Sequence, residues 1–309
     1  MLWRHIMIDC EDRPAHTQLK VAAASSTGIE LKRISPAIGV EVSGIDLRQP
    51  VSEEQARELR QALVAHKVLV FRGQNITPAQ HVAFASRFGE LELHPVFPHH
   101  SDHAELVLLG GNSKIPGTEN VYHTDVSWRE TPSMASVLRC VECPEVGGDT
   151  VWINMEQAYE QLPETRKQQI AGLYAVHDIL PSFGARMTPA QQAQARGKYP
   201  PVVHPVVRTH PESGQKILYV NETFVTHFAN FSSKFDSFRS ANEIHAQQQD
   251  LMNYLLRQPA ILEYQMRLHW EPNTIAMWDN RSTQHYAIQD YFPAVRRMHR
   301  ATVVGDKPF

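Results

Sequence analysis

Apolar residues recur at helical spacing in two places near the start of the sequence. Ser52 and Gln55 have the spacing of a helix-capping box, and apolar residues follow them every three or four positions. Thr77 and Pro78 begin a second such stretch, and Gly89 lies where a glycine would end it. The sequence therefore predicts a helix after each of these starts.

From about residue 105 the pattern changes to short apolar runs separated by Gly, Pro and Asn. These predicted strands cover 106–109, 134–141, 150–153, 173–176, 202–207 and 217–220, after an earlier one at 67–71. Residues 261–270 alternate between apolar and polar, which is typical of a half-exposed strand. Helical inserts are predicted at 154–173, with a restart at Pro163, and at 240–258. We therefore expect a mostly β chain with helical inserts, built as a barrel or jelly roll.

The chain is expected to form one domain over residues 29–309. Residues 1–28 lack clear periodicity and are expected to be a loosely ordered leader. Residues 181–201 resemble a long connection without regular structure. Loops of that length are usually lids or mobile surface loops, so both remain open here, with a lid as our prediction.

Composition and charge restrict the class of partner. The chain has 309 residues, 42% of them hydrophobic, and a formal net charge of -3. It contains no block of like charges, so we expect neither a nucleic acid nor a membrane surface as partner. No stretch of 18 consecutive apolar residues occurs, and the first residues lack the apolar core of a signal peptide, so a cytoplasmic location is expected.

The cysteines are expected to be free thiols. Cys10, Cys140 and Cys143 are too few for a disulfide framework, which agrees with a reducing compartment. The spacing of Cys140 and Cys143 is C-x-x-C, but no second pair and no helix pattern follow it.

Two histidines and one aspartate form a candidate metal site. His123 and Asp125 lie two residues apart in a β-like run, so in a strand they would point to the same face. An ordinary strand-end histidine beside a solvated carboxylate would give the same pattern. His285, which follows the polar turn after Trp278, is the candidate for the third ligand. Two histidines and one carboxylate are the facial set that leaves metal positions open, as in non-haem iron oxygenases.

Two arginines downstream indicate anion binding. Arg296 and Arg300 are four residues apart, so in a strand they would share one face. Two inward guanidinium groups are costly without anions to bind. The alternative is pairing with protein carboxylates such as Glu30 or Glu222.

Taken together, these motifs resemble the taurine dioxygenase family of iron(II)- and 2-oxoglutarate-dependent oxygenases. The matching pieces are His94-Pro95-Val96, His123-Thr124-Asp125, Gly147-Gly148-Asp149-Thr150, Ser182-Phe183, the run from His204 to Pro211, Tyr219-Val220-Asn221-Glu222, and Trp278-Asp279-Asn280-Arg281 through His285 to Arg300-Ala301-Thr302. They occur in order from about residue 29 to the end of the sequence, so the resemblance covers nearly the whole chain.

The resemblance implies a double-stranded β-helix, or jelly-roll, core and an iron centre. His123, Asp125 and His285 match the iron(II) ligands of the family. Thr150 and Arg296 match the residues that hold the distal carboxylate of 2-oxoglutarate, which is a cosubstrate together with O2. A hydroxyl and a planar guanidinium suit a carboxylate.

The resemblance also implies a site for a small anionic substrate. Arg300 and His94 match the residues that bind its anionic head, and Ser182 falls on a further substrate position. Phe183 and Phe224 resemble the apolar wall over the carbon to be oxidised. The resemblance also implies that the chain forms homodimers or homotetramers.

Two positions differ from the taurine pattern. Phe97 stands where taurine dioxygenases have tyrosine, and Glu119 stands where they have asparagine. A hydroxyl and an amide that could recognise the substrate are therefore missing, and a carboxylate would repel a sulfonate or attract an amine. Taurine itself is therefore not the expected substrate.

The expected reaction is hydroxylation of an alkyl sulfonate or alkyl sulfate ester at the carbon bearing the sulfur group. It would give an aldehyde with sulfite or sulfate, while 2-oxoglutarate becomes succinate and CO2. One alternative is a hydroxylase of aryloxyalkanoates or other carboxylic acids. Another is a non-catalytic barrel that binds zinc through the same three ligands.

Overall fold

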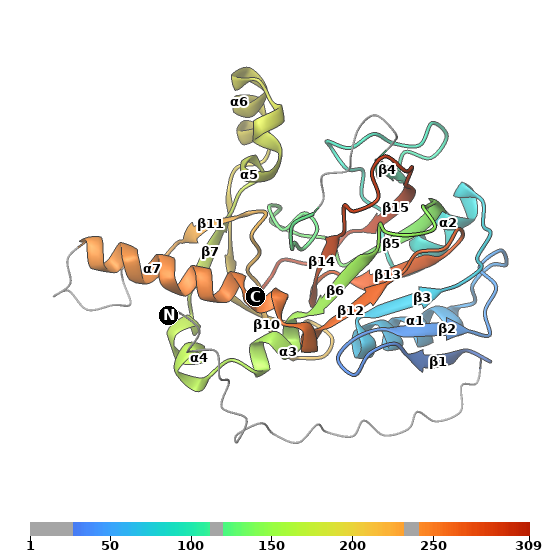
Figure 1. Ribbon diagram of the computed structural model, residues 1–309, viewed down its shortest axis with the longest axis horizontal. Helices are drawn as coiled ribbons and strands as arrows, with labels where there is room; N and C mark the ends of the chain where they lie inside the picture. The colour runs from blue at the N-terminus through green and yellow to red at the C-terminus, as the bar shows by residue number, and fades with distance from the viewer. Residues whose placement is uncertain (1–26, 112–119, 232–240) are drawn as a thin grey trace.

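The computed structural model describes residues 27–111, 120–231 and 241–309 (Figure 1). The predicted leader lies almost wholly outside these residues, as does Glu119. Among the described residues, no helix is long and apolar enough to span a membrane.

Strands and helices alternate along the chain much as the hydrophobic pattern indicates. The strands are β1 (Glu30–Arg33), β2 (Val40–Ser43), β3 (Val68–Phe71), β4 (Val107–Leu109), β5 (Ala135–Glu142), β6 (Thr150–Asn154), β7 (Tyr174–His177), β8 (Val202–Pro205), β9 (Val207–Thr209), β10 (Lys216–Leu218), β11 (Val225–Phe228), β12 (Gln265–Leu268), β13 (Ile275–Asp279), β14 (Thr283–Ala287) and β15 (Arg297–Val303). The helices are α1 (Glu53–His66), α2 (Pro78–Ala85), α3 (Met155–Glu160), α4 (Glu164–Ile170), α5 (Leu180–Phe183), α6 (Pro189–Lys198) and α7 (Ala241–Leu256), with short 3-10 turns η2 (Ser86–Phe88), η3 (Gly184–Arg186), η4 (Gln258–Ala260) and η5 (Leu262–Tyr264).

Two sheets pack face to face to form the core of the fold. The larger has the order β1-β2-β3-β13-β5-β15-β4, and only its β2/β3 pair is parallel. The smaller has the order β12-β6-β14. Trp152 of the smaller sheet lies 5.5 Å from Trp278 of the larger, measured between ring centroids. The fold class expected from the sequence, mostly β with a jelly-roll core, is confirmed.

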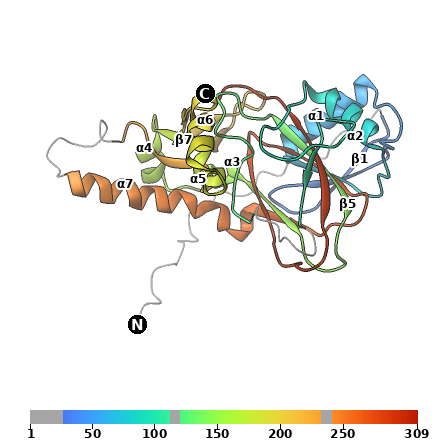
Figure 2. The same ribbon diagram turned by 90° about the horizontal axis from the view of Figure 1, so that it is seen from above.

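Helices α1 and α2 cover one face of the larger sheet, α1 over β3 and β13 and α2 over β15 (Figures 1 and 2). Each begins with the predicted capping box, Ser52 with Gln55 and Thr77 with Gln80. Buried leucines of α1 and Phe84 of α2 pack into one apolar cluster with the sheet. Helix α2 ends at Ala85 and continues as η2, so Gly89 follows a 3-10 turn rather than the α-helix itself.

The helical inserts pack beside the smaller sheet. Helices α3 and α4 confirm the insert and its restart at Pro163, and α7 confirms the second insert. Their buried residues share a second apolar cluster with β6, β7 and β10.

Two local predictions were wrong. Residues 181–201 are not an irregular loop, because α5, η3 and α6 occupy most of the segment. In 261–270 only Gln265–Leu268 is a strand, since η5 precedes it and leaves Leu262 77% exposed. The apolar alternation is nevertheless seen from Tyr264 to Trp270, whose even-numbered side chains are buried.

Candidate active site

His123 and His285 are brought together by one antiparallel β-bridge. The backbone N–H of His123 donates to the carbonyl of His285 at 3.1 Å, and the N–H of His285 donates to the carbonyl of His123 at 2.9 Å. His285 belongs to β14, but His123 lies outside any longer strand and Asp125 begins a turn in which Val126 has a φ of 47°. The expected strand around His123 and Asp125 is therefore wrong. The bridge and the turn, rather than strand alternation, bring the aspartate toward both histidines.

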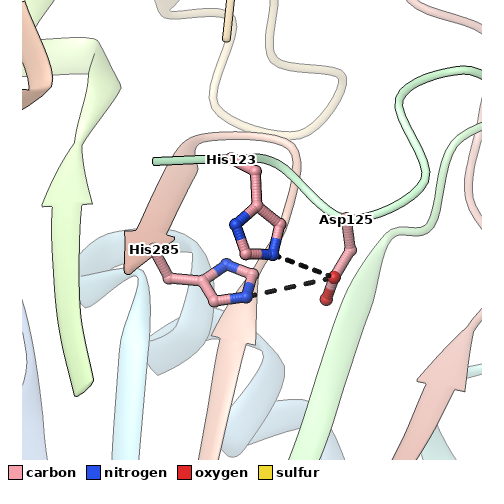
Figure 3. A group of neighbouring side chains, drawn as sticks. All are labelled: His123, Asp125 and His285. Carbon is pink, nitrogen blue, oxygen red and sulfur yellow. Dashed lines mark ion pairs between the residues drawn. The ribbon is translucent and has the colours of Figure 1, made fainter. Parts of the chain in front are cut away.

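The three side chains converge on one point (Figure 3). Nε2 of His123 lies 3.7 Å from Oδ1 of Asp125, and Nε2 of His285 lies 3.9 Å from the same oxygen. One ligand atom from each residue lies within 4.8 Å of the others, and no other group of three potential ligands comes this close in the part of the chain that the structure describes. This arrangement can hold one metal ion and leave part of its coordination sphere open.

Neighbouring groups hold the triad in this orientation. Nδ1 of His123 lies 2.7 Å from the carbonyl of Val121, so a proton on Nδ1 leaves the lone pair on Nε2. The hydroxyl of Ser136 donates to Oδ2 of Asp125 at 2.9 Å. Asn280 accepts from the backbone N–H of Asp125 at 3.0 Å and donates to its carbonyl at 2.9 Å. The carboxylate is thereby fixed both through its side chain and through its backbone.

Electrostatics keep Asp125 and His285 in the forms that bind metal. Burial raises the pKa of Asp125, but Arg300 and the two histidines more than offset this and hold its pKa well below the usual range. Burial, aided by His123, lowers the pKa of His285 well below its ordinary value. A carboxylate and neutral imidazoles are the donors that an iron(II) site requires, so the residues fit that ion.

Thr150 and Arg296 form a second polar group beside the triad. Arg296 donates to the hydroxyl oxygen of Thr150 at 3.2 Å, and the indole N–H of Trp270 donates to the same oxygen at 2.9 Å. The hydroxyl proton of Thr150 is then directed away from both donors and is available to an anion. Gly148 allows the arginine to pass closely, because a Cβ there would lie 3.2 Å from Cδ of Arg296.

Arg300 contacts the triad through Asp125. Its Nη1 donates to Oδ1 of Asp125 at 2.8 Å, so its protein partner is neither Glu30 nor Glu222. Its Nε is buried and has no hydrogen-bond partner among the described residues. The expectation that Arg296 and Arg300 share a strand is wrong, since Arg296 precedes β15 and the register shifts after Arg297. Both guanidinium groups nevertheless reach the same cavity.

All the sequence-predicted site residues that the structure describes line one cavity of about 130 Å³, here called the triad cavity. Beyond the three ligands and the two arginines, it is lined by His94, Phe97, Thr150, Ser182, Phe183 and Phe224. The ring centroid of Phe183 lies 5.7 Å from that of Phe97 and 6.3 Å from that of Phe224. Burial, helped by the charge of Arg300, lowers the pKa of His94 to about 3, so this side chain is neutral near pH 7.

Several lining residues are not among the sequence-predicted site residues, above all Trp128 and Arg186. Trp128 follows the triad turn and is buried, but an isolated tryptophan is not distinguishable in sequence from a core residue. Arg186 lies within the predicted lid, where its charge and position near Ser182 and Phe183 were an available signal.

A larger cavity of about 660 Å³ lies elsewhere, between α1, the turn after β1 and the segment before β10. It contains none of the predicted site residues. The chemistry of the side chains, rather than the size of the cavity, therefore identifies the triad cavity as the candidate active site.

Comparison with known proteins agrees with this geometry. The sequence model of the taurine catabolism dioxygenase TauD, TfdA family matches residues 30–302. The chain belongs to the TauD, TfdA family. Members of this family of dioxygenases use iron(II) and 2-oxoglutarate with O2, so the chain is a non-haem iron(II)/2-oxoglutarate-dependent dioxygenase.

Several TauD, TfdA relatives align over most of their length. An alpha-ketoglutarate-dependent sulfate ester dioxygenase of Pseudomonas putida is 34% identical and aligns with 91% of each chain. An alkylsulfatase of Acinetobacter baylyi is also 34% identical, over 90% of this chain and 86% of its own. The crystal structure of a taurine dioxygenase from Burkholderia xenovorans, 34% identical and covering 91% of both chains, superposes with a TM-score of 0.74.

Proposed function

We propose that this dioxygenase hydroxylates a small organic sulfate ester or sulfonate at the carbon that bears the sulfur group. The hydroxylated product would then collapse to an aldehyde and sulfate or sulfite. The observation that carries the proposal is Arg300, a buried guanidinium beside the triad whose Nε has no hydrogen-bond partner among the described residues. The names of two relatives, a sulfate ester dioxygenase and an alkylsulfatase, support the same substrate class.

The side chains of the triad cavity divide the work between them. His123, Asp125 and His285 would hold iron(II), and Thr150 with Arg296 would bind the distal carboxylate of 2-oxoglutarate. With its cosubstrates bound, the iron centre supplies the oxidising power that hydroxylates a C–H bond as 2-oxoglutarate becomes succinate and CO2.

The remaining lining residues would position the substrate and exclude water. Arg300 and His94 would bind the sulfate or sulfonate group, with Ser182 as a further polar contact. The aromatic rings of Phe97, Phe183 and Phe224 would enclose the carbon chain. Glu119 remains a candidate substrate residue outside the described part of the chain.

Residues 181–201 are proposed to close over this cavity as a lid of the single domain 29–309. Ser182, Phe183 and Arg186 line the cavity, and α6 contains no buried residue, so little apolar packing holds it in place. We further expect a homodimer or homotetramer in the cytoplasm.

A substrate panel tests the proposed function. We expect alkyl sulfate esters or sulfonates to couple succinate formation to release of sulfate or sulfite in equal amounts. Iron-loaded Asp125→Ala protein should consume no 2-oxoglutarate. Arg300→Ala should keep iron binding but raise KM for the sulfur substrate by roughly 10- to 100-fold, because a charge-assisted hydrogen bond is lost.

Two other outcomes would replace the proposal. Coupled turnover with aryloxy acids alone would make the enzyme a carboxylic acid hydroxylase. Iron binding without succinate formation on any sulfonate, sulfate ester or acid would favour a non-catalytic metal-binding barrel.

A further inference from the structure

Arg186 supplies a third guanidinium group to the triad cavity. Its side chain lines the cavity together with Ser182 and Phe183. It is exposed, and the structure gives it no ion pair or hydrogen bond to any described side chain. Arg296 and Arg300 differ in this respect, because each donates a hydrogen bond to a cavity residue.

The backbone that carries Arg186 is held in place by specific contacts. Arg186 ends η3, and the N–H of Met187 closes this turn on the carbonyl of Gly184 at 3.0 Å. Gln192 of α6 donates to that same carbonyl at 2.9 Å. Three residues earlier, the ring of Phe183 packs on the cavity wall. These contacts hold the backbone of η3 so that Arg186 lines the cavity.

The charges around the cavity leave Arg186 in excess for a substrate with one negative charge. The described lining residues carry three guanidinium groups and one carboxylate, Asp125, while His94 is neutral near pH 7. A dipositive iron ion brings the sum to four positive charges, and 2-oxoglutarate, with two negative charges, leaves two. A monoanionic substrate leaves one positive charge uncompensated, whereas a dianionic substrate leaves none. Because Arg186 is exposed, its charge is solvated when no second anion is bound, and it remains available to pair with one.

The lining residues include one arginine beside the triad and another on the segment proposed as the lid. Arg300 is buried beside the triad, and Arg186 is exposed on the segment proposed as the lid. The aromatic side chains of Phe97, Phe183 and Phe224 line the same cavity. A guanidinium group can bind a carboxylate or a sulfate through two parallel hydrogen bonds.

We propose that Arg186 is a specificity-determining residue that binds a second anionic group on the substrate, at the end remote from the oxidised carbon. The preferred substrate class is then an organic sulfate ester or sulfonate that also carries a carboxylate or a second sulfate. This inference rests on the proposed function, since it adds a second contact to the same substrate.

Paired substrates test the inference. We would compare kcat/KM for pentyl sulfate and for 5-carboxypentyl sulfate in the full-length wild-type enzyme and in Arg186→Gln. Wild type should favour the dianion. Arg186→Gln should lower kcat/KM for the dianion by roughly 10- to 100-fold, mainly through KM, and change the monoanion by less than about threefold. Arg186→Lys keeps the positive charge but cannot make two parallel hydrogen bonds. Its kcat/KM for the dianion should therefore fall between the values of wild type and Arg186→Gln.

Arg87→Gln is the matched control, because Arg87 is exposed on η2 and makes no contribution to the triad cavity. This variant should have the wild-type kcat/KM for both substrates. Equal effects of Arg186→Gln on the two substrates, or no effect on either, would overturn the inference.

The comparison is made within whichever head-group class the substrate panel supports. If only carboxylic acids are turned over, the proposed function fails, and the inference is then decided by a monocarboxylic and dicarboxylic pair. The substrate panel therefore decides the proposed function, and the comparison of singly and doubly charged substrates decides the role of Arg186.

Discussion

Asn280 shows how much of the candidate site depends on residues that touch no substrate. Its side chain binds both backbone groups of Asp125 and also donates to the hydroxyl of Ser133 at 2.8 Å. It is fully buried, so it has no water with which to exchange these bonds. Asn280 thus sets where the Asp125 carboxylate can point, and it is a positioning residue for the metal.

Replacement of Asn280 tests this role. We expect Asn280→Ala to weaken iron(II) binding by roughly 10- to 100-fold, because groups that orient metal ligands typically contribute that much to affinity. Titration with iron(II) under anaerobic conditions measures the change. Asn75→Ala, at an exposed asparagine, is the control and should bind iron like wild type. An Asn280→Ala protein that is folded and binds iron with unchanged affinity would contradict the positioning role.

Single residues differ in how well the sequence predicts them. That His123, Asp125 and His285 would lie together was predictable, because few residue types bind iron and the family pattern locates them. The contribution of Asn280 could not be read from its type, since it acts through backbone groups 155 residues away. Arg300 was expected beside an anion, but its hydrogen bond to Asp125 depends on how β15 pairs with β5.

At the scale of elements, capping signals were more reliable than hydrophobic periodicity. The capping boxes before α1 and α2 were predicted and are present. The same signal precedes α6, where Thr188 and Gln191 form a capping box and Pro189 is the first helical residue. That helix was missed because none of its residues is buried, so it has no apolar stripe to detect.

The anchoring of α6 leads to a prediction about the proposed lid. Arg196 of α6 donates to Oδ2 of the buried Asp178 at 3.1 Å, and Oδ1 of Asp178 accepts from the N–H of Leu180 at 2.9 Å. We expect Asp178→Ala to raise KM for the sulfur substrate several-fold and to leave KM for 2-oxoglutarate unchanged. Trypsin should also cleave the variant faster after Arg186, Arg196 or Lys198, because the segment opens more often.

The control for Asp178→Ala is an exposed ion pair that includes no residue of the segment 181–201. Lys307→Ala removes the exposed contact with Glu130 and should change neither KM nor the rate of cleavage. If Asp178→Ala raised both KM values equally, the segment would be a general structural element rather than a lid.

At the scale of the whole molecule, several histidines are buried in the neutral form. His81 is inaccessible to solvent, and burial lowers its pKa to about 3. The pKa of His94 is also lowered to about 3, chiefly by burial. An unfolded chain would protonate both residues near pH 6.5. Between pH 6.5 and 3 the unfolded state therefore binds more protons, and stability is lost as the pH falls through this range.

A comparison at two pH values tests this effect. From pH 7 to pH 5, one such histidine should cost about 2 kcal/mol of unfolding free energy. His81→Gln should therefore lose about 2 kcal/mol less than wild type over the same interval, whatever its stability at pH 7. Urea unfolding with EDTA present measures the unfolding free energies of wild type and His81→Gln at both pH values. His227→Gln, at an exposed histidine, is the control and should show the wild-type pH dependence.

The order of strands was the least predictable feature of the molecule. The sequence indicated where most strands lie, but β13 pairs with β3 and β5 across about 200 and about 140 residues of chain. Such pairings depend on complementary surfaces that form only when the two sheets pack, so no local pattern reveals them. Periodicity indicated a barrel or a jelly roll, and the family resemblance narrowed this to a double-stranded β-helix.

The β-bridge between His123 and His285 also determines when an iron site can exist during folding. The bridge closes a loop of about 160 residues, whose entropy must be lost before the two imidazoles can meet. Of the three ligands, an unfolded chain keeps only His123 and Asp125 close together, so we expect iron to bind the folded chain far more tightly. By mass action, free iron at 100 times its dissociation constant would stabilise the fold by about 2.7 kcal/mol. We therefore expect a higher iron supply to increase the amount of folded enzyme as well as its activity.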